Sequence, residues 1–201
     1  DLIRALVDLL EVDAAFIGVR GEGEGNETMR TWSFFLDGRW LHDLEYPLVG
    51  SACETVLSGG FRYYPHGLPE RFPGCGVDAI GIEGYAGMPL HAENGEPLGV
   101  VAVMSHAPLK SPERVESILG LFATRVAVEV EQARTAAALD ASNERYGEVF
   151  RASLDGLAML KRDGTIVDVN PAMLALCGYP PAALVGRGIG VLVAQPDAQA
   201  I

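Results

Sequence analysis

The longest regular pattern of hydrophobic and polar residues is helical and runs from Ser111 to about Ser153. Ser111 can cap the start of this helix, and Pro112 suits its first turn, which needs no backbone donor. Gly156 provides a stop just past the last turn. About 40 residues at roughly 1.5 Å each make a rod of roughly 60 Å. We therefore expect the second half of the helix to leave one domain and enter another.

Apolar residues of this helix form two sets. The first set has the spacing of a stripe that faces a core and comprises Val115, Ile118, Leu119, Phe122, Val126 and Val130. The second set is sparser and comprises Ala133, Ala137, Leu139, Tyr146, Val149 and Phe150. Polar residues such as Arg125 and Asp140 interrupt an ideal coiled-coil register. A long solvated helix and a parallel pair of helices both remain open. We favour a homodimer through residues 111–153, because an isolated rod leaves the second set bare.

Ahead of this helix, the pattern predicts one helix and several antiparallel strands. A helix is expected from the first residues to about Glu11. Alternation and turn residues predict strands at 14–19, 29–36, 39–46, 84–91 and 97–105, with a short helix at 52–57. The glycine-rich segment from Gly21 to Asn26 is expected to be a hairpin turn, since its two glutamates would repel a phosphate. The predicted fold class is α+β, with an antiparallel sheet flanked by helices.

Composition excludes several classes of function. The formal net charge of −12 argues against a nucleic-acid groove and against binding to an anionic membrane. No apolar run reaches the roughly 20 residues of a membrane span. The 3 cysteines form no CxxC pair, which favours a reducing, cytoplasmic location. The 4 histidines lack the spacing of metal ligands, so we expect no metal site, and no cofactor can be named.

Several motifs resemble those of a known family. The segment 50–60 (GSACETVLSGG) resembles the G-x-x-C-E-x-V-L-x-x-G helix of GAF domains. Sequences similar to the later GAF signatures occur at 71–73 (RFP), 87–90 (GMPL) and 95–100 (GEPLGV). Residues 111–133 resemble the closing GAF helix. The resemblance covers residues 1–137, which we expect to form a GAF domain.

The end of the chain resembles the first part of a PAS domain. Glu144-Arg145-Tyr146 followed by Val149-Phe150 matches the helix that leads into that family. The hairpin turn at Asp163-Gly164 and the helix start at Asn170-Pro171 continue the match. We expect a GAF domain at 1–137, a signalling helix at 111–153 and a partial PAS domain at 154–201. Because the later PAS strands are missing, residues beyond Gly156 are expected to be incomplete or poorly supported.

The GAF and PAS resemblances together imply a regulatory function. Both families include sensors that hold a small molecule and relay its binding along a helix to an output domain. Here the output domain would lie further along the same chain, as in two-component or cyclic-di-GMP signalling. No enzyme activity and no catalytic residue are expected in these residues.

GAF ligands lie under the segment that follows the 52–57 helix, so aromatic residues near that segment are the candidate pocket. The candidate ligand-binding residues are Trp32, Trp40, Cys53, Tyr63, Tyr64, His66, Phe72, Tyr85 and Met88. Two alternatives stay open. Cys53 and Cys75 could imitate the cysteines of GAF-type free methionine sulfoxide reductases, or the domain could be a ligand-free dimerisation module.

Overall fold

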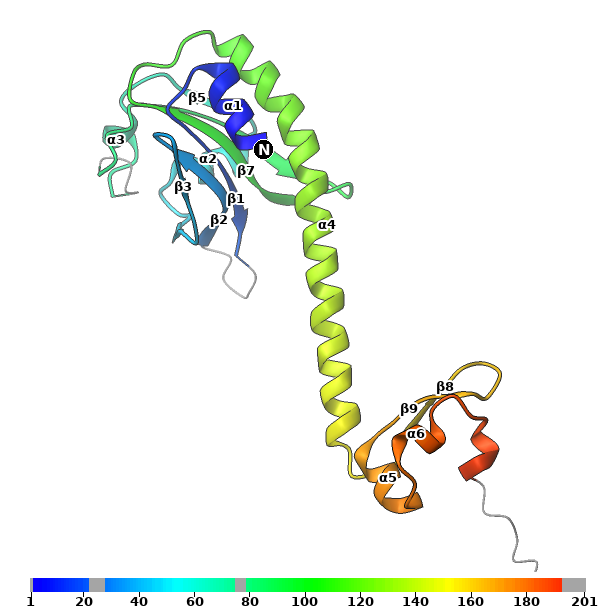
Figure 1. Ribbon diagram of the computed structural model, residues 1–201. Helices are drawn as coiled ribbons and strands as arrows, with labels where there is room; N and C mark the ends of the chain where they lie inside the picture. Colours follow the sequence, from blue (N-terminus) through cyan, green and yellow to red (C-terminus); the bar gives the residue numbers. More distant parts are fainter. Residues whose placement is uncertain (1, 22–27, 75–78, 193–201) are drawn as a thin grey trace, which may run out of the picture. The chain divides into compact units, whose positions relative to one another are not determined.

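The computed structural model describes residues 2–21, 28–74 and 79–192 (Figure 1). The chain divides into two compact units, Asp1–Arg134 and Thr135–Ile201, and each is described by itself. Most of the predicted glycine-rich turn lies outside the described residues. Cys75 also lies outside them. In the described ranges, no helix is long and apolar enough to cross a membrane.

The first unit contains an antiparallel sheet of seven strands. Its elements are α1 (Leu2–Leu10), β1 (Ala14–Arg20), β2 (Thr28–Leu36), β3 (Arg39–Leu41), β4 (Glu45–Pro47), α2 (Ala52–Gly59), β5 (Arg62–Tyr64), α3 (Leu68–Arg71), β6 (Gly84–His91), β7 (Pro97–Ser105) and the start of α4 (Pro112–Ala152). The strands lie in the order β3-β2-β1-β7-β6-β5, and β4 also pairs with β2. The predicted α+β class with helices flanking an antiparallel sheet is confirmed.

The strand predicted at 39–46 is wrong in one respect, because it is divided into β3 and β4. Both pieces pair with β2 in one continuous register, with Leu41 opposite Phe34 and Glu45 opposite Arg30. The interruption falls at Asp43, whose φ of 54° lies in the left-handed region that a strand does not adopt. The Asp43 carboxylate accepts a hydrogen bond from the Arg30 guanidinium at 2.9 Å, which holds this bend beside β2.

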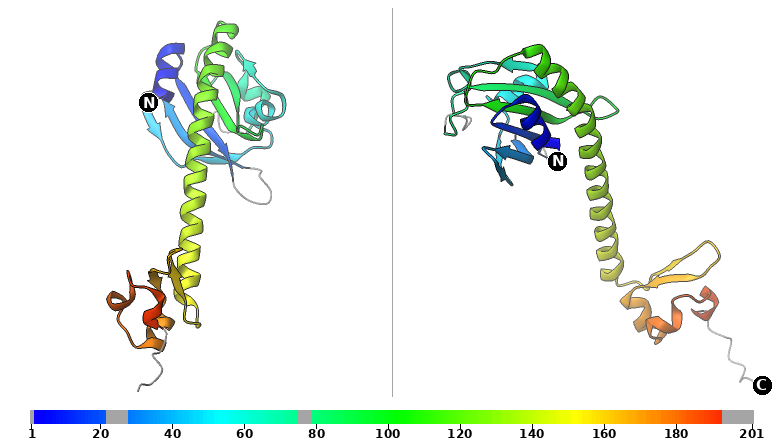
Figure 2. Two further views of the ribbon diagram at one scale, coloured as in Figure 1. Left: turned by 90° about the vertical axis from the view of Figure 1, so that its right-hand side faces the viewer. Right: turned by 45° about the horizontal axis from the view of Figure 1, so that its top comes forward.

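Two apolar layers lie on opposite faces of the sheet. Helix α1 and the first half of α4 cover one face, and α2 and α3 lie on the other (Figure 2). Strand β7 serves both layers because its side chains alternate: Val101 and Val103 face the α1–α4 side, whereas Val100 and Ala102 face the α2–α3 side. From Leu98 to Ser105 every residue of β7 is buried, as its apolar run predicts.

Helix α4 is one continuous helix of 41 residues, which confirms the predicted extent of the rod. Its buried residues include Val115, Leu119, Val126 and Val130, all from the predicted stripe. Ser111 precedes the helix with a φ of 57°, which is not the extended conformation usual at an N-cap.

The second unit contains a two-stranded sheet and short helices. Its elements after α4 are β8 (Ala158–Leu160), β9 (Ile166–Val169), α5 (Pro171–Cys177), α6 (Pro181–Leu184) and the 3₁₀ helix Ile189–Leu192. The predicted cap at Asn170 is confirmed, since its side-chain oxygen accepts from the Met173 amide at 2.9 Å. The same oxygen accepts from the Leu157 amide at 2.8 Å, which ties α5 to the start of the hairpin.

The residues beyond Gly156, which were expected to be poorly supported, have a small buried core in the structure. This core consists of Ile166, Val169 and Leu184 among the described residues. Large apolar side chains such as Leu154 and Leu176 remain exposed. The described part of this unit is thus ordered by caps and turns around a very small core.

The packing of α4 leads to a stability prediction. Leu119→Ala should lower the free energy of unfolding of the first unit by about 2–5 kcal/mol, because Leu119 is 0% exposed. Glu116→Ala, an exposed change on the same helix, should stay within about 0.5 kcal/mol. Both tryptophans lie in the first unit, so denaturant titration followed by tryptophan fluorescence reports on that unit. Equal effects of the two substitutions would contradict the placement of Leu119.

Candidate functional site

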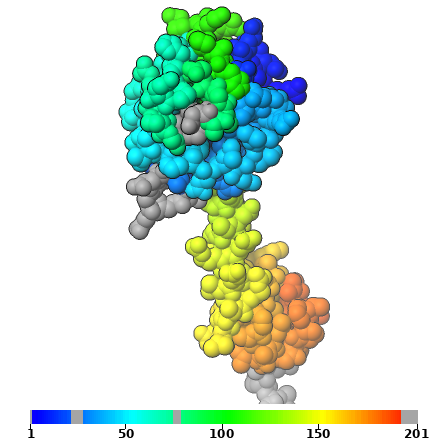
Figure 3. Space-filling view, turned by 90° about the vertical axis from the view of Figure 1, so that its left-hand side faces the viewer, coloured from blue at the N-terminus to red at the C-terminus, as the bar shows by residue number. Residues whose placement is uncertain are grey.

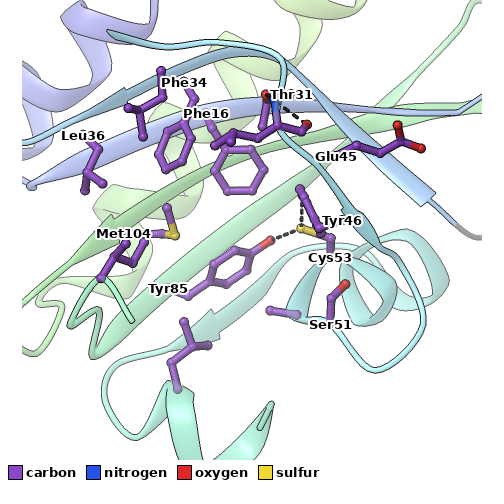
Figure 4. A pocket seen from close by; sticks show the side chains of 15 residues that line it. Phe16, Thr31, Phe34, Leu36, Glu45, Tyr46, Ser51, Cys53, Tyr85 and Met104 are labelled. Atoms are coloured by element: carbon purple, nitrogen blue, oxygen red, sulfur yellow. Dashed lines mark hydrogen bonds between the residues drawn. The ribbon is translucent and has the colours of Figure 1, made fainter. Parts of the chain in front are cut away.

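A cavity of about 280 Å³ lies on the α2–α3 side of the sheet (Figure 4). Its walls come from β1, β2 and the β3–β4 segment, from the first turn of α2, and from β6 and β7. The lining residues are Phe16, Thr31, Phe34, Leu36, Leu41, Leu44, Glu45, Tyr46, Ser51, Ala52, Cys53, Leu68, Ile80, Tyr85 and Met104. Figure 3 shows the segments from β2 to α3, blue to cyan-green, forming the outer surface on this side of the first unit.

One wall of the cavity carries a small polar network. The Cys53 sulfur lies 3.3 Å from the Tyr46 hydroxyl and 3.5 Å from the Tyr85 hydroxyl (Figure 4). Cys53 and Tyr85 are both buried. Burial raises the pKa of the Tyr85 phenol well above its usual value, and the neighbouring Cys53 adds to the rise. Tyr85 therefore stays neutral and presents a hydroxyl group in an apolar setting.

Local sequence explains how this network is positioned. Ser51 caps α2 by accepting a hydrogen bond from the Glu54 amide at 3.3 Å, so Cys53 lies in the first turn, above the sheet. The Tyr85 ring lies close along β6, where Gly87 has no side chain. A Cβ at position 87 would come within 2.5 Å of the Tyr85 hydroxyl oxygen and 2.8 Å of Val56. Gly87 therefore allows α2 and the Tyr85 ring to approach the strand closely.

The hydroxyl groups of Thr31 and Ser51 in the cavity wall are engaged in local structure. The Thr31 hydroxyl donates to the Leu44 carbonyl at 3.2 Å and accepts from the Leu44 amide at 3.0 Å, which ties the segment between β3 and β4 to β2. The Ser51 hydroxyl donates to the Leu48 carbonyl at 2.6 Å. Among the described lining residues, Glu45 is the one charged side chain, and none is Lys, Arg or His. Such a wall suits a neutral and largely apolar molecule.

The structure places the predicted pocket residues in several different surroundings. Cys53 and Tyr85 line the cavity. Tyr64 and Phe72 lie on the same side of the sheet but outside the lining; the Tyr64 ring packs against Tyr85, and Phe72 packs edge-on against Tyr64. Trp40, Tyr63 and Met88 pack against the α1–α4 layer on the opposite face. Trp32 is 43% exposed and His66 is exposed.

The position of Trp32 has a specific cause. Ile17 of β1 pairs with Ser33, whereas the next residue, Gly18, pairs with Thr31. Trp32 is therefore the extra residue of a bulge, and the alternation along β2 shifts by one position there. Thr31 rather than Trp32 lines the cavity together with Phe34. Strict alternation, applied to the sequence, places Trp32 on the same face as Phe34 and so misses Thr31.

Most of the cavity wall was not predicted. Phe16 and Met104 come from β1 and β7, which pair although they are far apart in sequence. Phe34 comes from β2, and Leu41, Leu44 and Tyr46 come from the divided strand. Alternation within β1 and β7 could have found Phe16 and Met104, given the strand order. The second cysteine of the reductase alternative, Cys75, lies outside the described residues, so the structure does not address that pair.

One further group of side chains in the described residues is rich in polar atoms. Asp13, Asp37 and His106 have oxygen and nitrogen atoms within 4.8 Å of one another. Both ring nitrogens of His106 already have a hydrogen-bond partner, Gly81 and Asp37. The group is therefore a hydrogen-bonded cluster, and its three members do not belong to the cavity lining.

Comparison with known proteins gives one family match near the end of the chain and several similar folds among solved structures. Residues 144–200 match the family model of the PAS domain. The fold is similar to that of the GAF domain of an Acinetobacter phosphoenolpyruvate-protein phosphotransferase, with a TM-score of 0.52, 15% identity, and coverage of 68% of this chain and 82% of that one. The GAF-B domain of DevS from Mycobacterium smegmatis gives a TM-score of 0.51 at 17% identity, covering 69% of this chain and 93% of that one.

A larger protein shows a similar fold. A bacteriophytochrome from R. palustris gives a TM-score of 0.52 at 11% identity, covering 75% of this chain but 37% of its own length. No curated protein matches the chain by sequence. These similarities show a GAF fold, and a PAS-type sequence at the end of the chain.

The buried phenol of Tyr85 leads to a prediction for alkaline solution. The pKa of Tyr85 is higher in the folded protein than the value of about 10 in the unfolded chain. The neutral phenol therefore contributes fully to stability below about pH 10, and this contribution is lost as pH rises through the folded-state pKa. In a spectrophotometric titration of tyrosinate, Tyr85→Phe should leave the native-state curve unchanged. It should remove one tyrosinate from the signal after unfolding. A smaller native-state signal in Tyr85→Phe would show that Tyr85 titrates in the folded protein.

Proposed function

We propose that the first unit is a sensor domain that binds a small, neutral, largely apolar molecule in the cavity beside Cys53 and Tyr85. The observation that carries this proposal is the cavity itself. Its wall is apolar apart from a few hydroxyl groups, one thiol-bearing residue and Glu45 at the β4 side. Its volume is close to the lower end of the roughly 300–1,000 Å³ of ligand sites. A compact molecule with one hydrogen-bonding group fits these features best.

The hydrogen-bonding group of the ligand would face the Tyr85 and Tyr46 hydroxyls. These two groups can donate or accept, and both lie at hydrogen-bond distance from the Cys53 sulfur. A ligand carbonyl, hydroxyl or ring nitrogen could share this network. An anionic ligand is disfavoured, because the described wall offers no basic side chain and includes the Glu45 carboxylate.

We propose binding rather than catalysis. The Cys53 sulfur lies at hydrogen-bond distance from the phenol hydroxyls of Tyr46 and Tyr85, and the described cavity lining contains no Lys, Arg or His. A reactive cysteine is usually activated by a basic side chain or a metal. In the reductase alternative, addition of free methionine sulfoxide would oxidise the protein thiols and release methionine. Failure to detect methionine by mass spectrometry supports the sensor, and its formation, lost in Cys53→Ser, supports the enzyme.

The route by which binding would be relayed begins in the sheet. Tyr85 of β6 and Met104 of β7 line the cavity, whereas Ala86 and Val103, their immediate neighbours, pack in the α1–α4 layer. A shift of either strand on ligand binding therefore changes the surface on which α4 packs. We propose that α4 carries this change to an output domain of the same polypeptide. A coupling free energy of about 1–3 kcal/mol is typical of such relays.

The exposed surface of α4 supports a homodimer. All five of its exposed large hydrophobic side chains fall on one heptad register: Leu121, Val128, Leu139, Tyr146 and Val149. Leu121, Val128 and Val149 are spaced by multiples of seven, and Leu139 and Tyr146 occupy the other apolar position of the same repeat. Arg125, Gln132, Thr135 and Ser142 are polar residues at positions of the same register. We propose that a second copy of the chain covers this seam in parallel, and that the protein acts in the cytoplasm.

Ligand binding can be tested with a neutral fluorescent probe, N-phenyl-1-naphthylamine. The wild-type protein should bind it with a rise in fluorescence. Ala52→Leu should weaken binding by about tenfold or more, because overpacking of the wall costs about 1–3 kcal/mol. Ala133→Leu, the same change at an exposed position of α4, should bind as the wild type does. Absence of binding to the wild type, or equal binding by both folded variants, would contradict the site.

The homodimer can be tested by sedimentation velocity. Leu139→Glu should shift the protein towards monomer, because it places two carboxylates in the apolar seam. Ala137→Glu adds the same charge to an exposed position two residues away, off the seam, and should leave the dimer intact. If both variants sediment as the wild type does, the seam is not the interface.

A further inference from the structure

The cluster of Asp13, Asp37 and His106 joins segments that are far apart in sequence. His106 follows the end of β7, Asp37 follows the end of β2, and Asp13 precedes β1. The His106 Nδ1 atom lies 2.9 Å from the Gly81 carbonyl oxygen, and its Nε2 atom lies 3.0 Å from the Asp37 carboxylate. One imidazole ring thus bridges the β2–β3 turn and the segment that leads into β6.

Both partners of the ring are acceptors. A carboxylate and a backbone carbonyl have no proton to give, and a neutral imidazole carries one N–H. The neutral ring can therefore make only one of these two hydrogen bonds, whereas the imidazolium makes both. The charged groups that face the ring are Asp37 and, from the α1–β1 connection, Asp13. Both favour the protonated form.

Asp13 also fixes the segment from which the ring projects. Its carboxylate accepts hydrogen bonds from the His106 amide and the Ser105 hydroxyl, both at 2.8 Å. Its backbone carbonyl accepts from the Asp37 amide at 3.0 Å. These bonds place the ring beside Asp37 in either protonation state, and the bridge made by the ring adds to their stability. The variable part is the bridge made by the ring itself.

Each bridged segment contributes a side chain to the cavity. Leu36 immediately precedes Asp37, Ile80 immediately precedes Gly81, and Met104 lies two residues before His106. Leu36 and Met104 lie at the same end of the cavity (Figure 4). This end of the wall is thus built from segments that the His106 ring holds together.

We propose that protonated His106 clamps this end of the cavity and that loss of its proton loosens the wall and speeds exchange of the ligand. This regulation of the cavity rests on the proposed function, although the clamp itself can be measured without a ligand. The hydrogen bond to Gly81, followed by that to Asp37, raises the pKa of His106 above its ordinary value, and partial desolvation opposes the rise. The clamp is therefore complete below about pH 6.5 and is lost as pH rises through the raised folded-state pKa.

The clamp can be tested through backbone amides that lie beside it. The Glu83 amide donates to the Ser105 carbonyl at 2.9 Å, and the Asp37 amide donates to Asp13. Hydrogen exchange of these two amides is measured by NMR from about pH 6 to about pH 8.5, and the rates are corrected for intrinsic exchange. This range includes the ordinary histidine pKa of about 6.5. In the wild type their protection should fall severalfold as pH rises.

Two variants and one control make this measurement specific. In His106→Gln, protection should be low and independent of pH, since the side chain can no longer become charged. Asp37→Asn should move the loss of protection to lower pH, because the facing carboxylate is gone. His91→Gln replaces an exposed histidine at the end of β6 and should behave as the wild type does. A pH profile in His106→Gln that matches the wild type overturns the clamp.

The effect on the cavity is measured separately, by the dissociation rate of N-phenyl-1-naphthylamine in stopped flow. Dissociation from the wild type should accelerate severalfold over the same pH range, and dissociation from His106→Gln should be fast throughout. If the probe binds but leaves the wild type at a rate independent of pH, the regulation of the cavity is overturned. If the probe does not bind while the amides respond as expected, the ligand proposal fails and the clamp is supported.

Discussion

The burial of β7 on both faces is the constraint on which the first unit depends. Val101 and Val103 support the layer of α1 and α4, and between them Ala102 supports the layer that contains α2 and the cavity. Because protein interiors are close-packed, neither layer can rearrange without moving the strand that supports the other. The sheet therefore separates the cavity from α4 in space and connects the two mechanically.

The cavity owes its shape to local features that would be unfavourable in a uniform sheet. Gly87 leaves room for the Tyr85 ring, the bulge at Trp32 turns Thr31 inward, and the left-handed Asp43 divides the edge strand. Each feature interrupts regular packing or pairing, and together they leave a space bounded by α2. Irregular strand pairing and backbone conformation next to a ligand-sized space are typical of binding sites.

The sequence predicted the fold much better than it predicted the site. The order of helices and strands, the buried stripe of α4 and the cap at Asn170 all follow from local periodicity and capping chemistry. Cys53 and Tyr85 were predicted through the resemblance to GAF domains. Trp40 and Met88 were assigned to the pocket although they face the helices, because the face of a side chain depends on strand register. A one-residue bulge cannot be read from alternation alone.

Helix α4 carries two sets of apolar residues, one buried and one exposed. Its buried residues end at Val130, whereas its exposed apolar residues continue from Leu121 to Val149. A helix that served only to close the first unit would need no apolar seam beyond Val130, since exposed leucine and valine contribute nothing to that core. A helix that served only for dimerisation would need no buried stripe. In the proposed dimer, a change in sheet packing and a change in helix pairing would act on the same continuous helix, as the proposed relay requires.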